Sequence, residues 1–151
     1  MRVPPPTLIA ALLVMACSAS QPTDVGSHAA RQSDLVRVTT SATTVNRSAD
    51  GTAHLTFQVT NEGTAPALLV QCGDQPSRTV EQWDGANWAE YTADVCPAIY
   101  ANVPVPLAPG ASRAGGVALA APGRYRVRIE ITSAPSDTAR RTVASDPFEV
   151  R

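Results

Sequence analysis

Strict alternation of apolar and polar side chains constrains the fold of this chain more than any other feature. It is clearest in residues 123–132, GRYRVRIEIT, where apolar residues from Tyr125 to Ile131 alternate with charged ones. A repeat of two places neighbouring side chains on opposite faces of a strand, so one face is buried and the other meets solvent. Residues 54–61, HLTFQVTN, repeat the pattern. Both segments are therefore predicted to be half-buried antiparallel strands.

Six further segments have the composition of short strands, namely residues 34–45, 67–72, 78–83, 87–92, 111–119 and 139–150. Turn signals such as SADG and NEGTAP separate them, and no segment has a convincing helical pattern. The sequence therefore predicts an all-β antiparallel sandwich of about 7–8 strands. The Pro- and Ala-rich stretch 95–109 is expected to be the least regular part.

The same periodicity predicts which way individual side chains point. Tyr125 lies near a strand start and is predicted to be a tyrosine-corner residue, whose hydroxyl bonds to the backbone upstream. Leu68, Val70 and Cys72 share a parity and are expected on the buried face of their strand. His54 falls on the polar face of its strand, which predicts a surface residue.

The N-terminal stretch is predicted to be an export signal. Residues 8–16 are an apolar run of about nine residues, the length of a signal-peptide hydrophobic region and well short of the roughly 20 that a membrane span needs. Residues 14–17, VMAC, resemble a bacterial lipobox, in which the Cys receives a diacylglycerol and becomes the first mature residue. The resemblance implies a cleaved signal peptide, residues 1–16, and a lipid on Cys17. The alternative is a plain signal peptide followed by an incidental Cys.

The lipobox sets the expected domain order and location. Residues 17–33 are polar, small and unpatterned, which predicts a flexible tether between the lipid and a sandwich domain at 34–151. Two or three acyl chains on one residue should hold the protein at a membrane. Because Ser18 rather than Asp follows the Cys, the outer membrane, facing the periplasm, is favoured if the organism is Gram-negative.

The two remaining cysteines, Cys72 and Cys96, are predicted to form a disulfide. Export places them in an oxidising compartment. A bridge would close a loop of about 25 residues, worth about 3 kcal/mol in the chain-entropy model. The alternative is a metal or redox pair, but there is no Cys-x-x-Cys, and His28 and His54 have no ligand spacing. No metal and no cofactor is therefore expected.

Several segments together resemble a known type of domain: FQVTNEGTAPALLVQCG, EQWDGANW, then Cys96, PLAPGAS and APGRYRVRIEI. They resemble the immunoglobulin-like domains of small exported bacterial lipoproteins, and are similar to the BsuPI-type intracellular proteinase inhibitor domain, over residues 36–150. The resemblance implies an immunoglobulin-like sandwich and, for the inhibitor type, a protease as partner. The export signal and the predicted disulfide depart from the inhibitor type, and no inhibitory residue carries over.

The segment EQWDGANWAEY is the best candidate for a binding surface, because Trp83, Trp88 and Tyr91 could stack on a sugar or grip a partner protein. The alternative is that these rings cover the core or its edge. The register of the hairpin is open. One register places Trp83 opposite Trp88 but also sets Glu81 opposite Glu90, a like-charge pair that disfavours it. A tighter turn at residues 84–85 places Trp88 opposite Glu81 instead.

Arg124, Arg126 and Arg128 form a positive ladder on one face of their predicted strand. Such a ladder could meet an anionic partner, such as a lipid phosphate or an acidic glycan. The alternative is a solvated strand face whose arginines pair with acidic neighbours.

The remaining composition narrows the function classes. The formal net charge of −1 argues against a nucleic-acid binder. No G-x-S-x-G, Walker or H-E-x-x-H motif is present, so no enzyme is expected. The sequence thus predicts a lipid-anchored, exported, non-catalytic binding or structural module of the cell envelope, with an envelope protein as a candidate partner. The alternative is a proteinase inhibitor acting through residues 96–109, and a weaker one is a glycan-binding module using Trp83 and Trp88.

Overall fold

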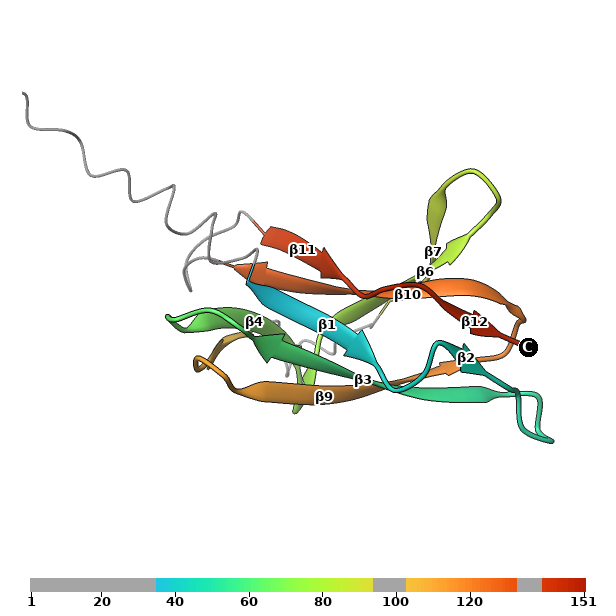
Figure 1. Cartoon of the computed structure of the whole chain (residues 1–151), viewed down its shortest axis with the longest axis horizontal. Coiled ribbons are helices and arrows are strands. Elements are labelled where there is room, and N and C mark those ends of the chain that lie inside the picture. The colour runs from blue at the N-terminus through green and yellow to red at the C-terminus, as the bar shows by residue number, and fades with distance from the viewer. Residues whose placement is uncertain (1–34, 94–102, 133–139) are drawn as a thin grey trace, which may run out of the picture.

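The computed structural model describes residues 35–93, 103–132 and 140–151, which form strands and turns with no helix among them (Figure 1). Within these ranges, nothing forms a helix capable of crossing a membrane. The predicted signal peptide and tether, residues 1–33, lie outside them. The strands are β1 (Val36–Thr40), β2 (Thr44–Val45), β3 (Ala53–Asn61), β4 (Ala67–Cys72), β5 (Gln75–Pro76), β6 (Arg78–Trp83), β7 (Trp88–Ala93), β8 (Val103–Leu107), β9 (Ser112–Leu119), β10 (Gly123–Thr132), β11 (Arg140–Ala144) and β12 (Phe148–Val150).

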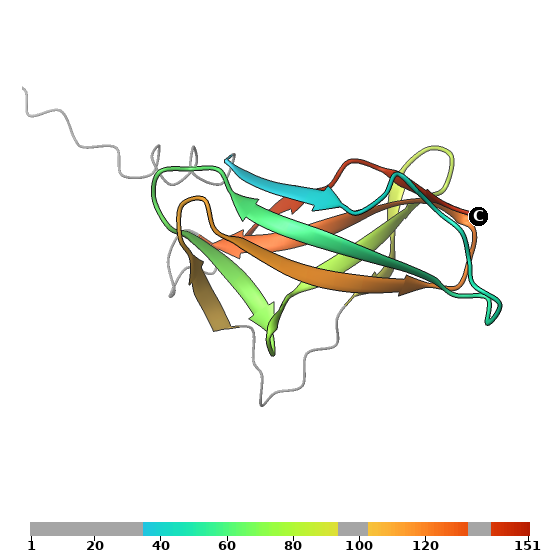
Figure 2. The ribbon, with the colours of Figure 1, turned by 60° about the horizontal axis from the view of Figure 1, so that its bottom comes forward.

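The strands form two sheets that face each other, as Figure 2 shows. The smaller sheet has the order β1-β3-β9 and is antiparallel. The larger sheet is built around β10, the longest strand. One edge of β10 pairs with β12 and β11, and its other edge pairs with β6 and β4. Beyond these, β7 pairs with β6, while β8 and β5 pair with β4.

The N-terminal strands join the two sheets. β1 lies antiparallel to β3 in the smaller sheet, and β2 then crosses over to lie parallel to β12 in the larger one. All other pairings between the described strands are antiparallel. The predicted all-β, immunoglobulin-like antiparallel sandwich is therefore confirmed.

The core lies between the sheets and is built from the apolar faces that the alternation predicted. On β10 the residues Tyr125, Val127 and Ile129 have no exposed surface, and the arginines between them face outward. On β3 the apolar residues are likewise buried, and His54 is exposed as predicted. The core residues of these and the neighbouring strands are Val36, Val38, Ala53, Leu55, Phe57, Val59, Ala67, Leu69, Val80, Leu107, Val117, Leu119, Tyr125, Val127, Ile129, Ile131, Phe148 and Val150.

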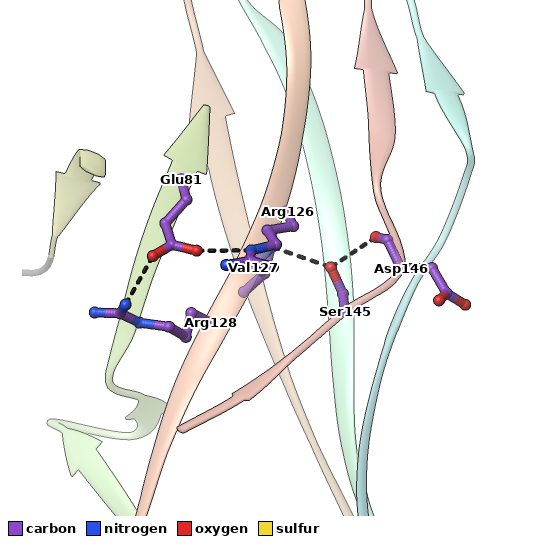
Figure 3. Close-up of polar contacts among 6 residues, drawn as sticks. All are labelled: Glu81, Arg126, Val127, Arg128, Ser145 and Asp146. Carbon is purple, nitrogen blue, oxygen red and sulfur yellow. Dashed lines mark hydrogen bonds and ion pairs between the residues drawn. The ribbon is translucent and has the colours of Figure 1, made fainter. Parts of the chain in front are cut away.

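The described chain has twelve strand segments, more than the predicted 7–8, partly because the first and last predicted strands are each divided in two. The last strand is interrupted at Ser145. Its N–H donates to the Val127 carbonyl at 2.8 Å, and its Oγ accepts from the Val127 N–H at 3.0 Å (Figure 3). The same Oγ donates to the Asp146 carbonyl at 2.9 Å. A side chain thus takes over a ladder position, which the apolar pattern alone does not reveal.

The prediction that residues 95–109 are irregular is wrong for residues 103–107. These form β8, which pairs with β4 in a continuous register from Val103 opposite Gln71 to Leu107 opposite Ala67. Pro104 and Pro106 lack N–H groups, so they are tolerated in a strand that pairs on one side only. Within the described residues, β8 pairs with β4 alone. The prolines therefore indicate an edge strand here rather than a loop.

The predicted parity of β4 is also wrong. Leu69, 1% exposed, and Ala67 face the core, whereas Leu68 and Cys72 are half-buried. Val70 is buried but is not part of the central core. Because β4 is nearly continuous in apolar residues, period-two alternation could not distinguish its two faces. Cys72 is disulfide-bonded. Cys96 lies outside the described residues, so its pairing with Cys72 stays a prediction.

The predicted tyrosine corner is confirmed. The Tyr125 hydroxyl donates to the carbonyl of Ala121, four residues upstream, at 2.9 Å. The ring stacks against Phe148 with centroids 6.0 Å apart. Burial raises the pKa of Tyr125 to about 12, with smaller contributions from neighbouring Tyr91. The residue thus fixes the turn before β10 to the core.

Candidate binding face

The outer surface of the larger sheet brings together most of the predicted binding residues. Arg126 lies opposite Glu81 across β10 and β6, and Trp83 lies opposite Trp88 across β6 and β7. Because side chains alternate along each strand, one face carries all of these groups. We call this surface the arginine–tryptophan face; its residues are Glu81, Trp83, Trp88, Glu90, Arg126 and Arg128.

Glu81 is the centre of this face and is clamped by two arginines, as Figure 3 shows. Its Oε2 accepts from Arg126 Nε at 2.7 Å, and its Oε1 accepts from Arg128 Nη1 at 2.7 Å. Glu81 is only 5% exposed, whereas the side chains of Arg126 and Arg128 are 28% and 35% exposed. Charge-assisted hydrogen bonds of this length are among the stronger polar contacts in proteins. The clamp therefore ties β6 firmly to β10.

The hairpin register that pairs the two tryptophans is the one observed. Trp83 lies opposite Trp88, with ring centroids 5.4 Å apart and ring planes inclined at 57°. Glu81 does lie opposite Glu90, as this register requires. The like-charge pair is tolerated because two arginines already balance the charge of Glu81, while Glu90 is exposed to solvent. A bulge follows between Val80 and Glu81.

The turn at the tip of the hairpin is tightly hydrogen-bonded. The Asp84 N–H donates to the Asn87 carbonyl at 3.0 Å, and Asp84 Oδ1 accepts from the N–H groups of Asn87 and Ala86 at 2.7 and 2.8 Å. These two donors lower the pKa of Asp84, that of Asn87 contributing most. Gly85 has a φ of 104°, a conformation that glycine adopts without strain. Local chemistry thus fixes the register of the aromatic pair.

Arg126 also holds the aromatic pair against the sheet. Its guanidinium carbon lies 4.5 Å from the centroid of the Trp88 ring, a cation–π distance. The same side chain therefore bonds Glu81 and covers Trp88 at once. Both tryptophans are half-buried. Part of their surface therefore packs within the domain, in line with the alternative that these rings cover the edge of the core. The rest of their surface is exposed to solvent.

Tyr91 does not belong to this face, which corrects its predicted grouping with the tryptophans. Its ring meets the edge of the buried Tyr125 ring, with centroids 5.2 Å apart. Tyr125 points into the core while its neighbour Arg126 points outward, so Tyr91 lies on the opposite side of the sheet from Trp88. Tyr91 is 37% exposed, at the open end of the inner face. Trp88 and Tyr91 are three positions apart, so a strict count of two along the strand already places them on opposite faces.

Each of the three predicted ladder arginines has a carboxylate partner. Arg126 and Arg128 share Glu81, and Arg124 Nε lies 3.9 Å from Glu149 Oε1 across the β10–β12 pair. Farther along β10, Glu130 Oε2 accepts from Arg140 Nη1 of the neighbouring strand β11 at 2.6 Å. The ladder is therefore largely balanced within the domain. Sequence reasoning treated Glu81 only as a source of repulsion. Glu81 lies on the strand that pairs with the arginine ladder, and this position could have identified it as the shared partner of Arg126 and Arg128.

Other parts of the described chain are weaker candidates for a binding or metal site. A shallow cavity of about 370 Å³ is lined by residues of β3 and β9 in the smaller sheet and of β5 and β6 in the larger sheet, namely His54, Leu55, Thr56, Gln75, Arg78, Gly116, Val117 and Ala118. Among the described residues, no three His, Cys, Asp or Glu side chains gather in a way that could hold a metal ion. Cys17 lies outside the described ranges, as does the segment 96–102 of the predicted inhibitory loop.

Comparisons with known proteins give fold-level similarity at most. No protein-family model matches the chain, and no curated protein matches its sequence. Among solved structures, it is similar to part of a β-glucosidase from Listeria innocua, with 14% identity, a TM-score of 0.36, and coverage of 76% of this chain and 16% of the enzyme. It is also similar to the structural genomics target SoR45, with 17% identity, a TM-score of 0.41, and coverage of 76% and 83%. The chain thus spans a small fraction of the β-glucosidase, and neither similarity bears on function.

Proposed function

We propose that the chain is an exported, lipid-anchored protein of the cell envelope whose immunoglobulin-like domain is a non-catalytic binding or structural module. Cys17 carries the lipid, and residues 17–33 tether the domain to the membrane. The sequence VMAC at residues 14–17 supports the anchor. In a Gram-negative cell the favoured location is the outer membrane, facing the periplasm.

The β6–β7 hairpin is the observation that carries the binding role. It projects away from the sandwich in Figure 1, and β7 is exposed along nearly its whole length. On its outer side it presents Trp83 and Trp88 beside Arg126. Tryptophan and arginine are the residues that most often dominate the energy of protein contacts. A projecting, rigid hairpin with these side chains is suited to contact with a partner.

A proteinase inhibitor remains the alternative that the sequence resemblance implies. No observation among the described residues favours it. Five residues of the segment 96–109, expected to act as an exposed loop, instead form β8 and pair with β4. We therefore prefer the binding or structural module.

The anchor is tested by detergent partitioning of the native protein and of Cys17→Ser. We expect the native protein in the detergent phase and the variant in the aqueous phase, because a doubly or triply acylated residue binds membranes almost permanently. Metabolic labelling with a fatty-acid analogue should mark the native protein alone. A native protein that stays in the aqueous phase and takes no label contradicts the anchor.

The binding role is tested by crosslinking in intact cells. A photoreactive residue in place of Ala86, which is exposed at the tip of the hairpin, should give discrete crosslinked species at the membrane, whereas one in place of Glu62, an exposed carboxylate near β1, should not. Trp83→Ala should weaken the species formed from Ala86. Equal yields from both positions would point to random contact and contradict a binding hairpin.

A further inference from the structure

We propose that the arginine–tryptophan face binds a neutral oligosaccharide, with a sugar ring packed against the tryptophan pair and its hydroxyls hydrogen-bonded to Glu90. This proposal rests on the proposed binding role of the hairpin and adds the chemical class of the ligand. It is carried by three observations on this face: the geometry of the aromatic pair, the balance of charge, and a carboxylate for which the described residues supply no partner.

The aromatic pair offers a surface of the right kind for a sugar. One side of a pyranose ring is lined by C–H groups and packs on an aromatic face, while its rim of hydroxyls stays polar. Trp83 and Trp88 are half-buried, 5.4 Å apart and inclined at 57°, so they form a bent platform rather than a flat stack. Indole rings provide large apolar contact with few rotatable bonds. Such a platform fits a ring that is apolar on one side only.

The platform is held in place before any ligand arrives. Arg126 covers Trp88 at 4.5 Å and is itself fixed by Glu81, while three hydrogen bonds made by Asp84 lock the turn between the strands. A ligand therefore does not have to order the two side chains, which lowers the entropic cost of binding. This matters on an open surface, where the contact area for a small ligand is limited.

The balance of charge favours a neutral ligand over an acidic one. The face carries two arginines, Arg126 and Arg128, and two carboxylates, Glu81 and Glu90. Both arginines already bind Glu81 at 2.7 Å. An anionic lipid or acidic glycan would have to compete with these ion pairs, and it would also approach the exposed Glu90. A neutral sugar meets neither obstacle.

Glu90 supplies the polar contact that orients a sugar. It lies on the same face as Trp88, two residues along β7, and is exposed. No hydrogen bond or ion pair of its side chain is found among the described residues. A carboxylate accepts hydrogen bonds and donates none, so a ligand that Glu90 orients must supply the donors. Sugar hydroxyls are such donors, and their bonds to a charged acceptor are stronger than neutral ones.

The test is titration of the full-length protein with hexasaccharides of glucose (both α- and β-linked) and of N-acetylglucosamine, followed by tryptophan fluorescence and calorimetry. The protein is kept in a zwitterionic detergent, because maltoside headgroups are themselves sugars. We expect saturable binding of at least one of them, with a shift of the tryptophan emission. Trp83→Ala and Glu90→Gln should each raise Kd by about tenfold or more.

Two variants control for indirect effects. Trp88→Phe retains an aromatic ring under Arg126 and should keep the fold while raising Kd by a smaller factor. Tyr91→Ala alters the same strand on the opposite face and should leave Kd unchanged. Each variant is checked for an intact fold by circular dichroism. Binding that survives Trp83→Ala and Glu90→Gln, or that fails equally in Tyr91→Ala, overturns the proposal.

Salt and an acidic polymer distinguish the ligand class. Binding of a neutral sugar should change by less than about twofold between about 50 and about 500 mM NaCl, because no net charge is screened. Polygalacturonate should bind more weakly than the neutral chains, and tighter binding of this polyanion overturns the neutral assignment. If no sugar binds while the probe at Ala86 still yields discrete crosslinks in cells, the sugar proposal fails and the binding role stands.

Discussion

At the scale of single residues, the buried side chain of Asn61 makes three hydrogen bonds to the backbone. It has no exposed surface. Its Nδ2 donates to the carbonyls of Ala65 and Leu107 at 2.9 and 2.8 Å, and its Oδ1 accepts from the Gly63 N–H at 2.9 Å. One side chain thereby shapes the turn after β3 and joins it to the end of β8. The sequence indicated a turn here but not that its Asn is buried.

Asn61→Ala should therefore be strongly destabilising. It leaves the buried Leu107 carbonyl, the half-buried Ala65 carbonyl and the buried Gly63 N–H without this partner, and we expect a loss of about 2–4 kcal/mol in the free energy of unfolding. Asn61→Asp keeps the acceptor but loses both donors, and should be similarly harmful. Urea denaturation measures the effect, with the exposed Asn46→Ala as a control expected within about 0.5 kcal/mol of the native protein. A mild Asn61→Ala contradicts the structural role.

The raised pKa of Tyr125 predicts that the domain loses stability at alkaline pH. Its pKa is about 12 in the folded domain, above the ordinary value of 10.0, so the folded state holds the phenolic proton more tightly than the unfolded state. This contribution to stability is complete below about pH 10 and is lost as the pH rises toward about 12. Tyr125→Phe should cost about 1 kcal/mol at neutral pH through the lost bond to Ala121. It should also flatten the alkaline decline, and identical pH profiles for the two proteins would contradict the assignment.

At the scale of strands and turns, the clamp at Glu81 joins β6 to β10. Glu81→Ala should destabilise the domain by about 2 kcal/mol, because Arg126 and Arg128 lose their shared acceptor but are exposed enough to hydrate. It should also loosen Arg126 from Trp88 and shift the tryptophan emission to longer wavelength. Glu62→Ala, which removes an exposed pair with Arg37 at 3.7 Å, is the matched control and should change stability little. Equal effects of the two variants would show that the clamp is not stabilising.

Two neighbouring glycines on β9 provide a sharp test of packing between strands. A methyl group on Gly115 would overlap the ring of Phe57, which lies directly across the β3–β9 pair, whereas one on Gly116 would lie 3.8 Å from the Leu55 carbonyl in ordinary contact. Gly115→Ala should therefore lower the free energy of unfolding by about 1–3 kcal/mol. Gly116→Ala should be neutral or stabilising, since alanine has less freedom to lose on folding. Thermal unfolding compares the two, and a reversed order would contradict the packing described here.

The strands with one buried face were the ones that could be predicted from sequence. On β3 and β10 the alternation alone gave both the existence of the strand and the direction of its side chains. On β4 it failed, because apolar residues occupy both faces. On β8 it failed because prolines hid an edge strand. The hairpin register was left open because the charge of Glu81 was judged without the arginines on β10, which only the folded sheet brings beside it.

At the scale of the whole molecule, the β6–β7 hairpin of the larger sheet projects away from the rest of the sandwich (Figure 1). The chain leaves β4, forms β5, β6 and β7, and returns through β8 to pair again with β4. The excursion carries Trp83, Trp88 and Glu90, which belong to the candidate binding face. It begins at Cys72, the last residue of β4. The predicted partner, Cys96, follows β7 in sequence. A bridge between them would close a loop that contains the whole hairpin.

We therefore expect a Cys72–Cys96 disulfide to restrain the hairpin relative to the rest of the domain. Cys72→Ser with Cys96→Ser should lower stability by about 3 kcal/mol, because closing a loop of about 25 residues removes freedom from the unfolded chain. For a domain of this size, the melting temperature should fall on the order of 10 °C. Reductant should reproduce the loss in the native protein and have no effect on the double variant. When the unmutated protein is unfolded in denaturant without reductant, alkylation should label neither Cys72 nor Cys96. Labelling of both would exclude the bridge and leave the hairpin held by the Glu81 clamp and by its pairing with β10.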